Sequence, residues 1–233
     1  MNTQVDRRHL IPLVGLLMLL SQVVMPLGGT AQEPSYDIIL RGGRVFDGAG
    51  NPWVYADIAV DDGRIAVVGA LGTISAEREI DLEGLYVMPG IIDVHSHANS
   101  GFDDEDPRAR ATINNLMQGI TTVVIGENGS AWNRDSSIGD KAEEWSRNGI
   151  GTNAAMLVGI DSVRHQVIDS HDVTPTAEDL IEMRALVREG MEGGAFGISS
   201  ALDYWDGHFT TTEEIIELAK EAADLGGFYS SHI

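Results

Sequence analysis

The sequence predicts an α/β protein whose parallel strands form a sheet or barrel, preceded by a small unit of β-strands. Two observations carry this prediction. Short strand-like runs separated by glycine-rich turns fill residues 36–87. From Pro89 onward, nearly continuous apolar runs alternate with segments of helical period, as buried parallel strands alternate with their crossover helices. The change of pattern at Met88-Pro89-Gly90 predicts a domain boundary, with domains at residues 32–88 and 89–233.

The amino terminus predicts an export signal. Arg7 and Arg8 precede an apolar run from Leu10 to Leu20, and Gly29-Thr30-Ala31 fits the small-residue pattern of a cleavage site. We expect cleavage after Ala31, which gives a periplasmic or secreted protein without stable membrane association. The alternative is an uncleaved anchor, because the apolar stretch extends toward Met25 and reaches roughly 20 residues, near the spanning length.

The first domain is expected to be a small antiparallel β unit that carries no site. Its four expected strands are Tyr36–Leu40, Arg44–Phe46, Ala56–Val60 and Arg64–Gly69. Asp62-Gly63 separates the last two, and an Asp-Gly pair between two β-rich runs is a strong hairpin signal.

The second domain is expected to contain five buried parallel strands. These are Ile91–His95, Thr121–Ile125, Asn153–Gly159, Ala195–Ser199 and Gly227–His232. Between them, Thr176 is a candidate cap for a helix that ends at Gly193-Gly194. Thr211 or Thr212 is a candidate cap for another that ends at Gly226-Gly227. Alternating β and α elements of this kind specify a parallel α/β sheet or barrel.

Composition excludes several classes of function. The chain has 36 acidic and 15 basic residues, for a formal net charge of −21, which repels the phosphates of nucleic acids and anionic lipids. It contains no cysteine, so disulfides, thiolate ligands and a cysteine nucleophile are ruled out. A bound metal must therefore be held by nitrogen and oxygen atoms.

Three histidines stand where a barrel collects metal ligands, at the carboxyl ends of strands. His95 and His97 alternate at the end of the first barrel strand, so strand period aims both imidazoles at one face. His232 closes the fifth strand. After the second strand, either Glu127 or Asn128 is a candidate oxygen ligand, although the residues alone slightly favour an ordinary turn there. The remaining barrel histidines, His165, His171 and His208, are expected at the surface.

Five segments taken in order resemble the N-acyl-D-amino-acid deacylases, or D-aminoacylases, of the amidohydrolase superfamily. They are Tyr36–Asp47, Met88–His97, Gly119–Gly129, Gly197–Tyr204 and Ala219–His232. The resemblance implies a small β-sandwich beside a metal-dependent (β/α)8 barrel, of which this chain would carry about five strands. It also implies hydrolysis of the amide of small N-acylated D-amino acids with one or two zinc ions.

The resemblance assigns metal ligation to His95, His97 and His232, and it points weakly to Tyr204 as a substrate contact. One departure concerns the turn that commonly reads G-N-C-G in the family, where the cysteine is a metal ligand. Glu127 and Asn128 stand at the Asn and Cys positions here. Our hypothesis is that the Glu127 carboxylate replaces the missing thiolate, since carboxylate oxygen is an acceptable zinc ligand.

The family's catalytic Asp and one further metal histidine would lie beyond Ile233. The barrel portion has about 145 residues, against about 250 for a typical closed barrel. We therefore expect an amino-terminal portion with little turnover in isolation. The alternatives are another amidohydrolase, of the hydantoinase, dihydroorotase or dipeptidase type, and a catalytically inert chain.

Overall fold

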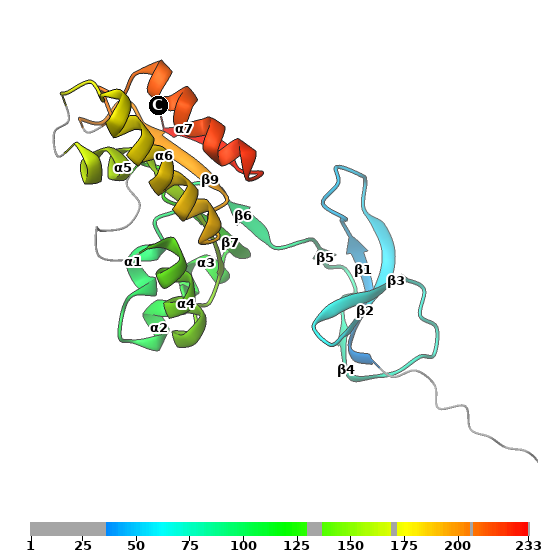
Figure 1. Ribbon diagram of the computed structural model, residues 1–233. Coiled ribbons are helices and arrows are strands. Elements are labelled where there is room, and N and C mark those ends of the chain that lie inside the picture. Colours follow the sequence, from blue (N-terminus) through cyan, green and yellow to red (C-terminus); the bar gives the residue numbers. More distant parts are fainter. Residues whose placement is uncertain (1–35, 130–136, 169–171, 206, 233) are drawn as a thin grey trace, which may run out of the picture. The chain divides into compact units, whose positions relative to one another are not determined.

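The computed structural model describes residues 36–129, 137–168, 172–205 and 207–232 (Figure 1). The chain divides into two compact units, Met1–Met88 and Pro89–Ile233. The expected export signal at residues 1–31 lies outside the described residues. No helix within the described ranges is both long enough and apolar enough to cross a membrane.

The first unit contains one five-stranded sheet. Its strands are β1 (Tyr36–Val45), β2 (Val54–Asp61), β3 (Arg64–Gly69), β4 (Ala76–Asp81) and β5 (Tyr86–Val87). They run in the order β3-β2-β1-β4, and β5 pairs with the end of β1. Residues 36–88 form this single sheet, and the second sheet of the expected sandwich is not among their strands.

Two expectations for this unit are wrong. The runs predicted as separate strands, Tyr36–Leu40 and Arg44–Phe46, are one strand whose pairing with β2 shifts register between Leu40 and Gly43. A bulge of this kind bends a strand without ending it. The unit is also not wholly antiparallel, because β4 and β5 pair parallel to β1.

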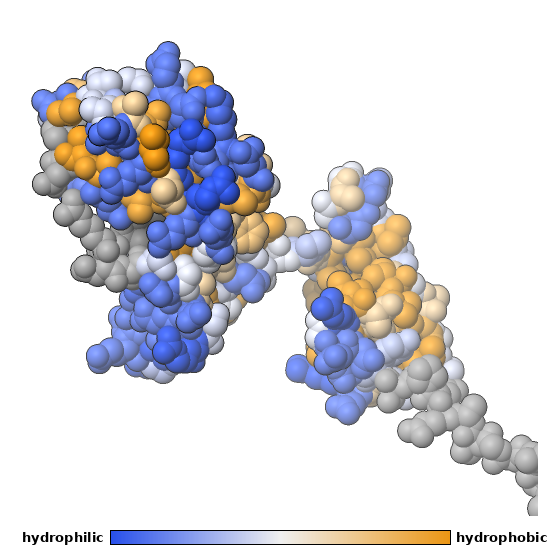
Figure 2. Space-filling view, in the orientation of Figure 1, coloured by the Kyte–Doolittle hydropathy of each residue, from blue (hydrophilic) through white to orange (hydrophobic). Residues whose placement is uncertain are grey.

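The small unit has little core and an apolar exterior. Its buried apolar cluster consists of Ile39, Ala59 and Leu71, and the other buried apolar residues described in the unit are Val45, Ile58 and Leu82. Apolar side chains are visible on its surface in Figure 2, and Val54 and Ile65 are among those that are exposed.

The second unit confirms the five predicted parallel strands. They are β6 (Ile91–Asp93), β7 (Ile120–Ile125), β8 (Asn153–Gly159), β9 (Gly197–Ala201) and β10 (Phe228–His232), and each pairs in parallel with its neighbour in sequence order. This order is the one that successive βα units produce in a barrel wall.

Seven helices of the described residues belong to this unit. They are α1 (Asn99–Phe102), α2 (Pro107–Arg110), α3 (Ile113–Leu116), α4 (Ile138–Asn148), α5 (Ile160–Val167), α6 (Ala177–Glu192) and α7 (Thr212–Asp224). The core lies between the strands and the longer helices, and it includes Ile198 of β9, Met183 of α6 and Leu218 of α7, all fully buried. On the face of this unit that Figure 2 shows, hydrophilic residues predominate and apolar patches lie among them.

The predicted helix caps are confirmed. The Thr176 side chain accepts a hydrogen bond from the Asp179 N–H at the start of α6, and the Asp179 carboxylate accepts one from the Thr176 N–H in return. Thr211, rather than Thr212, caps α7 by accepting from the Glu214 N–H. Such caps pair backbone donors that would otherwise have no partner in the first turn.

Candidate metal centre

The sheet of the second unit curls, so that side chains at its two outermost strands meet. β6 and β10 are the outermost strands of the five. Four flat steps of about 4.8 Å would place them roughly 19 Å apart. Yet the ring of His95, just beyond β6, lies 5.3 Å from the ring of His232 on β10, measured between centroids. Side chains from the first and last strands therefore meet at one end of a partial barrel.

His97 completes the group, with its ring centroid 5.6 Å from that of His95. The structure thus gathers His95, His97 and His232, although strand period is not the cause. β6 ends at Asp93, two residues before the predicted end; His95 lies in the bend that follows, and His97 lies in the irregular segment after it. The Asp93 carboxylate accepts a hydrogen bond from the His95 N–H at 3.3 Å, which turns the chain out of the strand.

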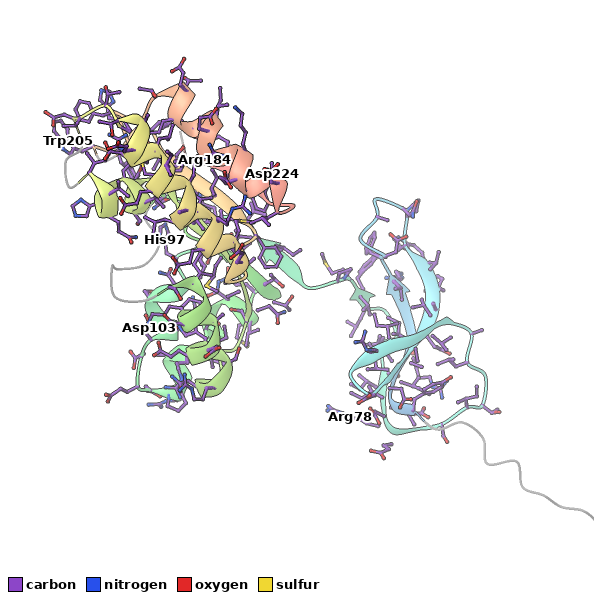
Figure 3. The ribbon with its side chains drawn as sticks, in the orientation of Figure 1. Arg78, His97, Asp103, Arg184, Trp205 and Asp224 are labelled. Carbon is purple, nitrogen blue, oxygen red and sulfur yellow. The ribbon has the colours of Figure 1, made fainter. Side chains whose placement is uncertain are left out.

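A pocket of about 250 Å³ lies beside these histidines. Its walls come from the segments that follow β6, β7 and β9, and they consist of His97, Asn99, Gly126, Glu127, Asn128 and Tyr204. The position at the carboxyl ends of parallel strands is where barrel enzymes place their active sites. Figure 3 labels His97 among the side chains of this unit.

Glu127 is the most unusual residue of the pocket. It is 3% exposed, and its Oε1 has no hydrogen-bond partner within the described part of the chain. Burial, together with the nearby negative charge of Asp93, raises the pKa of Glu127 to about 7. A buried carboxylate oxygen without a partner is costly, and a cation supplies what it lacks.

Two glycines shape the turn after β7, which places Glu127 and Asn128 in the pocket wall. Gly126 and Gly129 adopt φ values of 95° and 69°, in the left-handed region that glycine alone adopts freely. Between them, the Asn128 Nδ2 lies 3.5 Å from the His97 Nε2. The turn that the residues predicted is present, and it also carries Glu127 and Asn128 into the pocket wall.

The nitrogen and oxygen atoms of these side chains are of the chemical types that bind zinc. Imidazole nitrogen and carboxylate oxygen are both zinc ligands, and the unpartnered Glu127 oxygen needs a positive neighbour. As they stand, no three His, Cys, Asp or Glu side chains of the described residues are arranged to hold an ion. For these residues to hold an ion together, their side chains would have to be rearranged.

Tyr204, weakly predicted as a substrate contact, lines the same pocket and is 45% exposed. Its ring lies 5.0 Å from that of His232. The sequence reasoning missed its neighbour Asp203, whose Oδ1 lies 3.0 Å from the His232 Nδ1. The available signal was a carboxylate just past the carboxyl end of β9.

The other histidines lie elsewhere or outside the description. His165 on α5 and His208 in the β9–α7 connection are exposed, as expected of surface residues. His171 lies outside the described residues.

Comparison with known proteins shows which family this chain resembles. Residues 78–226 match the amidohydrolase family. The chain is 32% identical over 219 residues to the D-aminoacylase of Alcaligenes xylosoxydans xylosoxydans, covering 85% of this chain and 44% of that protein. It therefore spans about half the length of the curated relatives it matches.

Solved structures agree with this comparison. The N-acyl-D-glutamate deacylase from Bordetella bronchiseptica, complexed with zinc and a phosphonate inhibitor, superimposes with a TM-score of 0.77 at 31% identity. The match covers 86% of this chain and 45% of that one. A D-aminoacylase crystal structure matches with a TM-score of 0.76 at 32% identity, over 85% of this chain and 45% of that one.

Proposed function

This chain belongs to the amidohydrolase family, and from that premise we propose that it forms the metal-binding side of an enzyme that hydrolyses the amide of N-acyl-D-amino acids. The similarity to D-aminoacylase and N-acyl-D-glutamate deacylase over most of the chain supports this substrate class. The observation that carries the proposal is the meeting of His95, His97 and His232 beside a pocket with a buried carboxylate.

We propose zinc, as one or two ions, held by His95, His97 and His232, with Glu127 as the oxygen ligand. The complex of a similar deacylase with zinc supports this choice of metal. Bound zinc lowers the pKa of water and polarises a carbonyl group, which is the chemistry that amide hydrolysis needs. The chain contributes neutral imidazole nitrogens and a carboxylate kept from solvent by burial.

The pocket residues have distinct tasks in this proposal. Glu127 places a carboxyl group in the wall, where burial removes it from water and an ion would stabilise its charged form. The exposed Tyr204 ring forms an accessible part of the lining and suits contact with a substrate side chain or acyl group.

Assays of the protein expressed from the complete reading frame of its gene test this function. We expect hydrolysis of N-acetyl-D-amino acids, weaker hydrolysis of the L enantiomers and none of a hydantoin. His97→Ala should abolish turnover, whereas His165→Gln, at an exposed site on α5, should leave it unchanged. Turnover of the hydantoin without turnover of any N-acetyl-D-amino acid would replace this proposal with a cyclic amidohydrolase.

Export of the protein to the periplasm or medium is also proposed, on the pattern of residues 1–31 alone. The intact mass of the protein recovered outside the cytoplasm should correspond to a chain that starts at Gln32. A mass that retains Met1 would contradict cleavage.

A further inference from the structure

The turn that carries Glu127 and Asn128 is bonded to a strand that does not lie next to its own. The Ser199 hydroxyl on β9 donates a hydrogen bond to the carbonyl oxygen of Gly126, the residue that directly follows β7. In the sheet, β8 separates β7 from β9. The bond therefore joins the turn to a strand beyond its neighbour, a link that strand pairing alone does not supply.

The bonded carbonyl belongs to the peptide unit that leads into Glu127. A peptide unit is planar and stiff, so restraining the Gly126 oxygen also restrains the plane that contains the Glu127 nitrogen and Cα. Gly126 cannot supply this restraint itself, because glycine, here at φ 95°, has more backbone freedom than any other residue. The direction in which the Glu127 side chain leaves the turn therefore depends on Ser199.

The other end of the turn is held by different residues. The Ser162 N–H donates to the Gly129 carbonyl oxygen at 3.2 Å. A side chain at Gly129 has no room, because a Cβ there would lie 2.3 Å from the Asp161 Oδ2. This end stays anchored when Ser199 is altered, so the effect of the alteration is confined to the first peptide of the turn.

Ser199 is firmly placed in the sheet. It is fully buried, and it is paired with Gly159 of β8 on one side and with Ser230 of β10 on the other. A buried hydroxyl or carbonyl without a partner costs free energy, so Ser199 and Gly126 satisfy each other. A strand paired on both sides is a more precise support for a functional group than a loop.

We propose that Ser199 is a positioning residue that holds the turn after β7 in the shape that presents Glu127 to the pocket. The purpose of this role rests on the proposed metal centre, but the restraint of the turn does not require a metal. Ser200, the next residue, is equally buried, yet its Oγ lies 2.7 Å from the Tyr229 hydroxyl and 3.4 Å from the Ser231 Oγ, both on β10. Ser200 is therefore a matched control that bonds away from the turn.

Backbone NMR of the metal-free protein gives the first measurement. Ser199→Ala should shift the amide signals of Glu127 and Asn128, because the carbonyl that precedes them loses its donor. Ser200→Ala, which deletes the same group one residue away, should leave those two signals in place and shift signals of β10 instead. Unchanged amide signals of Glu127 and Asn128 in Ser199→Ala would overturn the proposal.

Zinc titration against a competing chelator, at a temperature where thermal melting shows every variant to be folded, gives the second measurement. We expect Ser199→Ala to weaken zinc binding about tenfold, the lower end of the range for residues that orient a metal ligand. Ser200→Ala should bind zinc as the wild type does, although each variant loses a buried hydrogen bond. A Ser199 with a merely structural role would lower stability without changing zinc affinity, and that result would overturn the proposal.

The two measurements separate this inference from the proposed function. If the wild type binds zinc and Ser199→Ala changes neither the turn signals nor the affinity, the metal centre stands and the role of Ser199 fails. If the wild type binds no zinc while Ser199→Ala, unlike Ser200→Ala, shifts the turn signals, the metal function fails and the restraint of the turn by Ser199 stands.

Discussion

The helix-covered face of the β6–β10 sheet and the pocket at its carboxyl end differ in whether a buried charged side chain has a partner. On the helix side, the buried Arg164 guanidinium donates to the buried Glu214 carboxylate, with Nη1 2.6 Å from Oε1. At the pocket, Glu127 is equally buried, yet its Oε1 has no partner within the described residues. A satisfied buried charge maintains a fold, whereas an unsatisfied one marks a place where a ligand is expected.

The largest effect on stability should come from breaking the paired charges of the helix side. Glu214→Ala leaves the Arg164 guanidinium buried without this carboxylate, and we expect a loss of about 3–5 kcal/mol in the free energy of unfolding. Urea denaturation measures it. The neighbouring exposed variant Glu213→Ala should change stability by no more than about 0.5 kcal/mol. Equal losses in the two variants would show that the buried pair has no special role.

A smaller, pH-dependent loss is expected between α6 and α7. Arg184 and Arg188 of α6 donate to Glu221 of α7, and the hydrogen bond from Arg184 holds the pKa of Glu221 below its usual value. Figure 3 labels Arg184 on α6, next to α7. A depressed carboxyl pKa stabilises the fold above the ordinary Glu pKa, and this stability is lost as pH falls through the depressed value.

Urea denaturation of the wild type and Glu221→Gln at several pH values checks this pair. The variant should be less stable at pH 7, and the difference should shrink as the pH falls below about 4.5, the ordinary range of the Glu pKa. A difference that stays constant with pH would mean that the ion pairs of Glu221 do not contribute.

Removing one helix cap should cost less. Thr176→Ala removes the side-chain acceptor of the α6 capping box, so we expect a loss of about 1 kcal/mol in the free energy of unfolding. Thr174→Ala is the matched control, because Thr174 is exposed and lies before the cap. Thermal or urea denaturation should separate the two variants, and identical stabilities would contradict the assigned cap.

The smallest effect on stability is expected at the pocket. Glu127→Gln removes a buried charge that has an unpartnered oxygen, so the metal-free chain should lose no stability at pH 8. Zinc affinity should nevertheless fall by roughly tenfold or more, because an amide oxygen is a weaker zinc ligand than a carboxylate. The exposed variant Glu105→Gln should change neither quantity. A stability loss above about 2 kcal/mol in Glu127→Gln would give that residue a structural role instead.

The sequence predicted the parts of the fold that local chemistry controls. The bounds of β8 and the caps of α6 and α7 follow from apolar runs and from Thr residues at helix starts. β4 was missed because its sequence, AEREID, lacks an apolar alternation, and its place beside β1 depends on long-range pairs such as Arg41 with Glu79. Sequence pattern alone does not report a contact between residues so far apart.

The candidate site was predictable to a similar extent. The barrel pattern placed His95, His97 and His232 at one end of the sheet, and the structure brings them together there. The sequence pattern could not show that the Glu127 Oε1 is buried without a partner among the described residues, or that Asp203 lies against His232. Both facts depend on the curl of the sheet and on the register of β9 with β10.

Metal content of the purified chain tests the central claim most directly. The wild type, His165→Gln and the double variant His95→Ala/His97→Ala are loaded with zinc, dialysed and analysed for bound metal by mass spectrometry. The wild type and His165→Gln should retain one or two zinc ions per chain, and the double variant should retain none. Equal zinc content in all three proteins, or none in the wild type, would contradict a metal centre at these histidines.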